Sequence, residues 1–180
     1  MQARSRGQQA GSRRIAGEMD GVEESDEQKM ETVDKEGAMA VIERRFHVNA
    51  PPEKVFAFLA DHANDPQWLP GLTDSRNFTG EGTDYRWEWT FKMAGLSFNG
   101  TGVVKEHEPP RRHVVETRGG LVSTWAWTIE PEGEGSQVAL RLEYTVPVAA
   151  VGKIAEKLLL RQNEKAADEG VANLQRILGG

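Results

Sequence analysis

The side chains that could do acid–base or metal chemistry in this chain are few and scattered along it. The four histidines, His47, His62, His107 and His113, lack the HExxH spacing or any other spacing typical of metal ligands. Alternation places His47 on the outer face of its strand, and His62 falls in a turn between two helices. The chain has no cysteine, which excludes disulfides, cysteine nucleophiles and cysteine-bound metals. We therefore expect no metal site.

Motifs for cofactor binding and covalent catalysis are also missing from the sequence. There is no phosphate-binding loop with a Gly-Lys-Ser/Thr ending, no dinucleotide fingerprint and no Gly-x-Ser-x-Gly elbow. Gly100-Thr101-Gly102 is interpreted as part of a strand rather than as a nucleotide-binding turn. The sequence predicts no cofactor and contains no recognisable catalytic constellation.

Three charged residues are predicted to project onto the inner, otherwise apolar face of a sheet. Alternation along the first strand puts Arg44 inward, and pairing across a Gly119-Gly120 turn puts Glu116 and Arg118 inward, near Tyr144. Buried charges need partners, so these residues either sit at a solvated rim or form the polar end of an apolar pocket. Such an end would orient an amphiphilic ligand. Glu116 with Arg118 or Tyr144 is also the one acid–base set that an enzyme could use here.

A β-hairpin with two chemically different faces is predicted around Ala94-Gly95. A two-residue turn at this dipeptide places Trp87 opposite Gly102 and Trp89 opposite Gly100. Large rings that face bare backbone bend a sheet, which makes its inner face concave and aromatic. Such a face wraps a helix, encloses an apolar ligand, or does both.

Strand and helix signals alternate along the rest of the chain. The expected elements are a strand ending near Asn49, a helix with Pro52 in its first turn, a short helix capped by Asp65, strands at about 73–79, 112–118, 121–130 and 138–146, and a long helix after Pro147. Pairing places Trp125 in the core between Val114 and Leu142. The long helix has one apolar face and a weak point at Gly170. We expect it to lie across the concave sheet and, with the short helices around Trp68, to gate a cavity.

Length and charge indicate one folded domain with a polar N-terminal tail. The chain has 180 residues and a formal net charge of −6. Residues 1–38 contain no aromatic residue and are predicted to be disordered, and residues 39–180 are predicted to form the domain. Met30 and Met39 are alternative start sites. No signal peptide and no membrane-spanning run is recognised, so we expect a cytoplasmic protein. The mild acidity argues against nucleic acid as a partner.

Several segments resemble those of a known superfamily. They are residues 46–56, Leu59-Ala60-Asp61, residues 66–70, Val104-Lys105-Glu106 before Pro109-Pro110, and Trp125-Ala126-Trp127. This set is similar to the START/SRPBCC superfamily, which includes birch-pollen-allergen-like proteins, and within it to the polyketide cyclase/dehydrase-like branch. The resemblance implies an α+β helix-grip fold. In that fold a curved seven-stranded antiparallel sheet wraps around a long C-terminal helix, with two short helices after strand one. It specifies the fold far better than the function.

The combined patterns predict binding of a hydrophobic or amphiphilic small molecule, such as a lipid, quinone or polycyclic aromatic, in an internal cavity. The candidate ligand-binding residues are Arg44, Trp68, Trp87, Trp89, Phe91, Phe98, Glu116, Arg118, Trp127 and Tyr144. Two alternatives stay open: a polyketide cyclase/dehydratase-type enzyme, and an accessory factor that docks on a partner protein.

Overall fold

The computed structural model describes residues 38–93, 95–146 and 148–179, with the side chains of residues 38 and 146–160 outside the description. The predicted disordered tail therefore lies outside the described residues, apart from its last residue. In chain order the elements are β1 (Ala38–Val48), α2 (Pro52–Ala60), the 3₁₀ turn η1 (His62–Asn64), α3 (Asp65–Trp68), β2 (Leu72–Thr79), the 3₁₀ turn η2 (Gly82–Asp84), β3 (Arg86–Met93), β4 (Leu96–Glu108), β5 (Arg112–Gly119), β6 (Val122–Glu132), β7 (Gly135–Val146) and α4 (Val148–Gly179).

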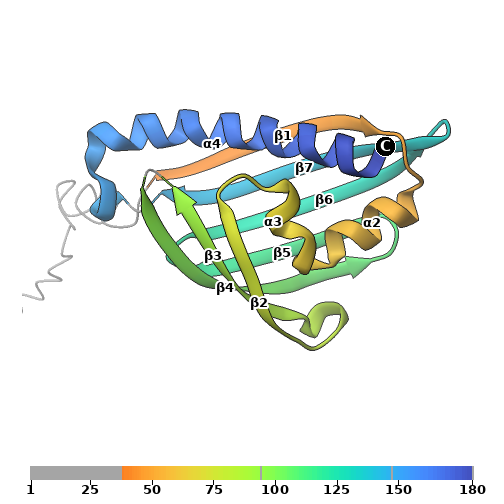
Figure 1. Cartoon of the computed structure of the whole chain (residues 1–180), viewed down its shortest axis with the longest axis horizontal. Coiled ribbons are helices and arrows are strands. Elements are labelled where there is room, and N and C mark those ends of the chain that lie inside the picture. Colours follow the sequence, from red (N-terminus) through yellow and green to blue (C-terminus); the bar gives the residue numbers. More distant parts are fainter. Residues whose placement is uncertain (1–37, 94, 147, 180) are drawn as a thin grey trace, which may run out of the picture.

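The strands form one seven-stranded antiparallel sheet in the order β1-β7-β6-β5-β4-β3-β2. From β2 to β7, each strand pairs with the strand that follows it in the chain. β1 instead pairs with the last strand, β7, so that Ile42 lies opposite Leu142. Figure 1 shows α4 running along the sheet beside β1, with α2 lying over β5 and β6 and α3 between β2 and α4. The predicted fold of a curved sheet, a long C-terminal helix and short helices after strand one is confirmed.

The predicted β3–β4 hairpin is confirmed residue by residue. Trp87 pairs with Gly102 and Trp89 with Gly100. A Cβ atom added to either glycine would lie 2.2 Å from Cζ2 of the facing indole, which is well inside van der Waals contact. The two glycines therefore let both indoles lie flat against β4, where they form the apolar floor of the concave face.

The predicted register between β5 and β6 is wrong by one residue. The expected turn held only Gly119 and Gly120, whereas β6 begins at Val122 and leaves Leu121 in the connection. Gly119 adopts a φ of +118°, a backbone conformation that side chains rarely allow, and this permits the longer turn. The resulting pairs are Thr117 with Ser123 and Val115 with Trp125, not Val114 with Trp125.

A one-residue slip moves every side chain of a strand to the opposite face. Val115 and Thr117 consequently face the interior, where Glu116 and Arg118 had been predicted. Glu116 lies on the outer face of the sheet, 3.7 Å from both Lys105 and Arg118. The predicted inward orientation of Glu116 and Arg118 is therefore wrong.

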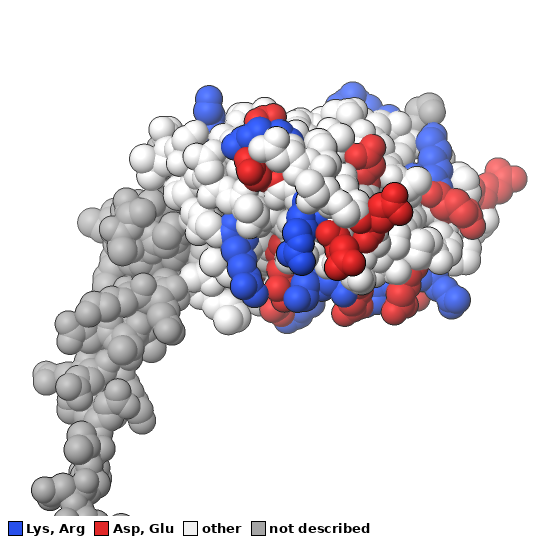
Figure 2. All heavy atoms as spheres, turned by 90° about the horizontal axis from the view of Figure 1, so that it is seen from below, with Lys and Arg blue, Asp and Glu red and all other residues white. Residues whose placement is uncertain are grey.

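Charged residues of both signs alternate on the outside of the sheet. Arg141 pairs with Glu43 and Glu143, and Arg112 pairs with Glu106. Figure 2, which views the molecule from below Figure 1, shows Lys and Arg interspersed with Asp and Glu rather than gathered into a patch of one sign. This face is a solvated surface of exposed ion pairs, each of which contributes little to stability.

The helices begin and end largely as predicted. Pro52 occupies the first turn of α2, where a missing N–H costs nothing. Asp65 does not cap α3: the residue before the helix is Asn64, and no side-chain cap hydrogen bond forms. α4 continues through Gly170 without a break. A Cβ at Gly170 would lie 3.4 Å from the ring of Trp68, an ordinary van der Waals distance, so α3 packs directly on α4 at this glycine.

Candidate functional site

An apolar cavity of about 130 Å³ lies between the concave face of the sheet and the helices that cover it. Strands β3, β5, β6 and β7 form its floor, and α2, η1, α3 and α4 form its walls. The described residues that line it are Leu59, His62, Asp65, Trp68, Leu69, Leu72, Trp87, Trp89, Phe91, Met93, Val115, Thr117, Leu121, Ser123, Trp125, Trp127, Leu142, Tyr144, Asn163, Ala166 and Ala167.

All five tryptophans of the chain border this cavity. Trp68 of α3 makes edge-to-face contacts with Trp125 and Trp127 of β6, at centroid distances of 6.0 and 5.6 Å. Trp87 and Trp89 complete the aromatic lining from β3. Aromatic pairs in this geometry contribute stability beyond their buried area. The same rings offer flat apolar surfaces to anything that enters.

The structure brings most of the predicted ligand-binding residues together. Those that line the cavity are Trp68, Trp87, Trp89, Phe91, Trp127 and Tyr144. Phe98 is buried opposite Phe91, in the core next to the cavity rather than among its described lining residues. Trp125, expected in the core, is only partly buried and does line the cavity. The role of these residues as ligand contacts stays a prediction.

The three charged residues of the prediction are engaged elsewhere. Arg44 does face α4, but its guanidinium binds two carboxylates of that helix, Glu164 at 2.5 Å and Asp168 at 2.7 Å. These hydrogen bonds raise the pKa of Arg44 above its ordinary value. Glu116 and Arg118 lie on the outer face, and the side chain of Arg118 is 76% exposed. None of the three is among the described lining residues.

A polar rung crosses the cavity floor from β5 to β7. The hydroxyl oxygens of Thr117 and Ser123 lie 2.6 Å apart, and the indole N–H of Trp125 donates to the Ser123 oxygen at 2.9 Å. Tyr144 pairs with Ser123 across the next strand. Burial raises the pKa of Tyr144, although its hydrogen bond to Asn163 of α4 works in the opposite direction. The phenol therefore stays neutral at physiological pH.

A second polar group closes the other side of the cavity. His62 of η1 donates its Nδ1 hydrogen to Asp65, at 2.8 Å, and its Nε2 lies 3.3 Å from Nε2 of His113 in β5. The other Asp65 oxygen accepts the indole N–H of Trp68 at 3.3 Å. The Asp65 carboxylate therefore accepts hydrogen bonds from both η1 and α3. The His62 imidazole connects these two elements to β5 of the sheet.

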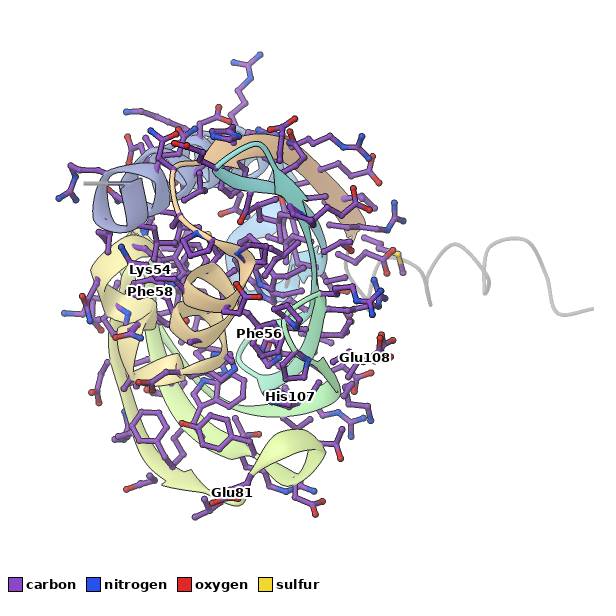
Figure 3. All side chains as sticks on the ribbon, turned by 90° about the vertical axis from the view of Figure 1, so that its right-hand side faces the viewer. Lys54, Phe56, Phe58, Glu81, His107 and Glu108 are labelled. Carbon is purple, nitrogen blue, oxygen red and sulfur yellow. The ribbon has the colours of Figure 1, made fainter. Side chains whose placement is uncertain are left out.

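His113 is buried beneath α2, with 1% of its surface exposed. Its ring makes edge contacts with Phe56 of α2 and with His107 of β4. Figure 3 shows Phe56 pointing toward His107, in agreement with their centroid distance of 5.1 Å. Burial, and then the neighbouring His62 and His107, lower the pKa of His113 from 6.5 to about 3. His113 is therefore neutral, and its Nε2 shares a hydrogen bond with Nε2 of His62.

The sequence analysis did not identify His62, Asp65, Thr117 and Ser123 as lining residues. The three-residue spacing of His62 and Asp65 is a signal that could have found that pair, because such side chains meet on one face of a turn. No local signal points to Thr117 and Ser123, because the error lay in the β5 register. Within the described part of the chain, no three His, Asp or Glu side chains converge to hold a metal ion.

A curved antiparallel sheet that grips a long C-terminal helix around an apolar cavity defines the class of helix-grip proteins. This chain belongs to the family described as polyketide cyclase/dehydrase and lipid transport, whose model matches residues 39–179. No curated protein matches the chain in a sequence search. None of the described helices is long and apolar enough to cross a membrane.

Solved structures of three different kinds of protein are similar to this one. TTHA0849 from Thermus thermophilus is 21% identical with a TM-score of 0.67, covering 76% of this chain and 95% of that one. The Zhui aromatase/cyclase from a Streptomyces species is 16% identical with a TM-score of 0.59, covering 77% and 95%. Ara h 8.0201 is 12% identical with a TM-score of 0.58, covering 78% and 98%. At these identities the likeness is one of fold.

Proposed function

We propose that this protein binds a hydrophobic or amphiphilic small molecule, such as a lipid, quinone or polycyclic aromatic, in the cavity between sheet and helices. The observation that carries the proposal is the gathering of all five tryptophans around a single apolar space. Aromatic rings that border an apolar space offer flat surfaces on which a ligand can be buried. The family description, which includes lipid transport, supports the same class of ligand.

Cavity size sets the kind of molecule that fits without rearrangement. A volume of about 130 Å³ is close to that of engineered protein cavities that bind benzene. One aromatic ring or a short acyl segment therefore fits the described conformation, and a larger ligand requires α3 and α4 to separate. Burying roughly 300 Å² of ligand would supply about 7 kcal/mol before ordering costs, which corresponds to a Kd of about 10 μM or weaker.

For the enzyme alternative, a cyclase or dehydratase, the candidate acid–base residues differ from those predicted from the sequence. Glu116 and Arg118 are outside the cavity, whereas His62 and Asp65 border it. Both ring nitrogens of His62 and both oxygens of Asp65 already have hydrogen-bond partners. A general base must accept a proton from the substrate, and both ring nitrogens of His62 are already engaged within the protein, so this arrangement favours binding over catalysis.

Intrinsic tryptophan fluorescence tests the proposal directly, because a ligand in this cavity contacts at least one indole. The protein is titrated with a panel of fatty acids, quinones and polycyclic aromatic compounds, and mass spectrometry then checks whether each bound compound is unchanged. We expect saturable quenching with intact ligands and Kd values of about 10 μM or weaker. No fluorescence change with any compound would contradict the proposal and favour docking on a partner protein. Conversion of a bound compound would favour the enzyme.

A matched pair of variants separates cavity binding from adsorption to the surface. Ala167 lines the cavity from α4, whereas Ala172 is exposed on the same helix. Ala167→Leu fills the space with the same side chain that Ala172→Leu adds to the solvent side. We expect the first to weaken binding by about tenfold or more and the second to leave it unchanged, because only the first overlaps the ligand.

A further inference from the structure

Accessible surface decides which of the five cavity tryptophans a ligand can touch. Four of them are between 3% and 5% exposed: Trp68, Trp87, Trp89 and Trp127. Trp125 is only partly buried, although it borders the same cavity and lies on the same inner face of β6 as Trp127. The accessible surface of the aromatic lining is therefore concentrated at Trp125.

The two indoles of β3 show why a place in the lining is not enough to contact a ligand. One side of the Trp87 ring packs on Gly102, and the other side is covered by the stacked imidazole of His62. Both faces of Trp87 are thus occupied by the protein itself. Trp89 packs on Gly100 in the same way and is equally buried. These rings form the structural floor of the cavity and have little surface to offer.

The surroundings of Trp125 suit a flat ring. The plane of Trp68 in α3 stands at 84° to that of Trp125, so a ligand ring laid parallel to Trp125 would lie nearly perpendicular to Trp68. Offset stacking and edge-to-face contact are the two geometries that aromatic rings prefer. Val115 and Leu142 lie opposite Trp125 on the neighbouring strands and border the cavity on either side of it. A saturated ring of the same size would be buried equally but would gain neither aromatic contact.

The polar rung holds the indole of Trp125 in a fixed orientation. Its N–H donates to the hydroxyl of Ser123 at 2.9 Å, and this hydroxyl lies 2.6 Å from that of Thr117 on β5. The hydrogen bond ties the ring to a residue two positions earlier in the same strand and restricts its rotation. A ring that is already held loses little conformational entropy when a ligand stacks on it.

We propose, on the basis of the function proposed above, that Trp125 is the indole on which the ligand stacks, and that it selects planar aromatic ligands over saturated ones of the same size. Trp125 is thus a specificity-determining residue of the cavity, and Ser123 is a positioning residue that acts through its ring. An acyl chain occupies the same space without a stacked contact and is the weaker class of ligand.

Benzyl alcohol and cyclohexylmethanol test the proposal, because they have the same carbon skeleton and the same uncharged hydroxyl group and differ in aromaticity. Their Kd values are measured by NMR titration of the wild type, Trp125→Leu and Trp127→Leu, with circular dichroism to confirm that each variant is folded. The ratio of the Kd of cyclohexylmethanol to that of benzyl alcohol cancels any change that weakens both probes alike. Trp127→Leu is the matched control, since Trp127 lines the cavity from the same strand but is 3% exposed.

We expect Trp125→Leu to lower this ratio about three- to tenfold, which is the effect of losing one aromatic stacking contact. Trp127→Leu should leave the ratio within about twofold of the wild-type value. Ser123→Ala should lower the ratio about two- to threefold, because the ring of Trp125 is no longer held. Ser123→Thr, which keeps the hydroxyl, should restore it. The two Ser123 variants provide the test if a tryptophan variant does not fold.

Indole signals in ¹H–¹⁵N spectra locate the bound ring. The signal that disappears in Trp125→Leu belongs to Trp125. It should move upfield when benzyl alcohol is added to the wild type, because a proton beneath the face of an aromatic ring is shielded, and it should move far less with cyclohexylmethanol. The signal of Trp87, assigned with Trp87→Phe, should change little with either probe, since both faces of that ring are covered.

An unchanged ratio in both Trp125→Leu and Ser123→Ala would overturn this inference while leaving ligand binding intact. A fall in Trp127→Leu as large as that in Trp125→Leu would overturn it as well. If neither probe binds the wild type, the proposed function fails and the inference fails with it. The two failures are therefore distinguishable in one set of titrations.

Discussion

The imidazole of His62 stacks on the indole of Trp87 with ring centroids 3.6 Å apart and planes 12° from parallel. This contact joins η1, which leads into the wall helix α3, to the sheet floor at β3. The hydrogen bonds of His62 to Asp65 and His113 add links to α3 and to β5. One side chain thus anchors the segment that covers the cavity.

Replacing His62 with alanine should detach this wall. The variant loses the stack on Trp87 and leaves Asp65 and His113 each short of a buried hydrogen-bond partner. We expect the free energy of unfolding to fall by about 2–4 kcal/mol. Amide exchange should accelerate in residues 62–72 more than in the sheet, because this segment opens locally. Chemical denaturation and hydrogen exchange measure the two effects.

His62→Phe serves as the comparison, since phenylalanine retains a ring over Trp87 but forms no hydrogen bond. The free energy of unfolding of His62→Phe should lie between those of the wild type and of His62→Ala. If His62→Ala unfolds like the wild type and exchange in residues 62–72 is unchanged, His62 does not anchor the wall.

Acid should destabilise the protein through His113. Its pKa is lowered from 6.5 to about 3 by burial and by the nearby His62 and His107, so the unfolded chain binds a proton at a pH where the folded protein does not. The contribution of this group is complete above pH 6.5 and is lost progressively as the pH falls toward 3. Stability should therefore drop over this range, with His113 contributing a slope of up to about 1.4 kcal/mol per pH unit.

Denaturation curves of the wild type and His113→Gln between pH 7.5 and 5 isolate this contribution. Glutamine does not titrate, so the slope should be shallower in that variant. Ser136→Ala is the control, because Ser136 is buried but does not titrate, so the slope should stay close to that of the wild type. Identical slopes in the wild type and His113→Gln would contradict the prediction.

The β3–β4 hairpin could be predicted residue by residue because Ala94-Gly95 favours a two-residue turn. In the register that this turn sets, the large aromatic residues of both strands fall on one face. The β5–β6 pair could not be predicted in this way, since two adjacent glycines accept a turn of either two or three residues. The one-residue error in the predicted turn placed Glu116 on the inner face, where the structure has Thr117. The predicted fold was still correct, because the alternation of Trp125 and Trp127 identifies the inner face of β6 independently of this turn.

The histidine group could not be read from the sequence for a different reason. His62 follows α2, whereas His107 and His113 lie on two strands more than forty residues further along. Their meeting depends on how η1 folds back onto the sheet, which no local pattern specifies. Only the spacing of His62 and Asp65 was available locally, and Asp65 also matched an ordinary helix cap.

Charged residues near the cavity should have little influence on ligand binding. We expect Arg44→Met to leave the affinity for a neutral ligand within about twofold, because the guanidinium is occupied by Glu164 and Asp168. The stability loss should stay below about 1 kcal/mol, since both carboxylates are at least half exposed. Glu116→Gln should likewise have no effect on binding. A tenfold loss of affinity in either variant would restore the predicted ligand role of that residue.

Substitution of Gly170 should tune the mobility of the wall that α3 and α4 share. In Gly170→Ala the helix gains about 1 kcal/mol of intrinsic propensity. The new Cβ would lie 3.4 Å from Cε3 and Cζ3 of Trp68, a contact that the packing accepts with little adjustment. We expect a higher Tm and slower ligand dissociation, because ligand release requires Trp68 and α4 to separate. Stopped-flow tryptophan fluorescence measures the dissociation rate.

Two further variants separate the effect of helix propensity from the effect of packing against Trp68. Ala172→Gly, at an exposed position two residues away, reports the helix propensity alone and should lower stability by about 1 kcal/mol. Gly170→Leu forces bulk against Trp68, and should therefore lower the Tm and speed dissociation even though leucine favours a helix. If Gly170→Ala lowers the Tm or leaves dissociation as fast as in the wild type, the contact between Gly170 and Trp68 does not control entry to the cavity.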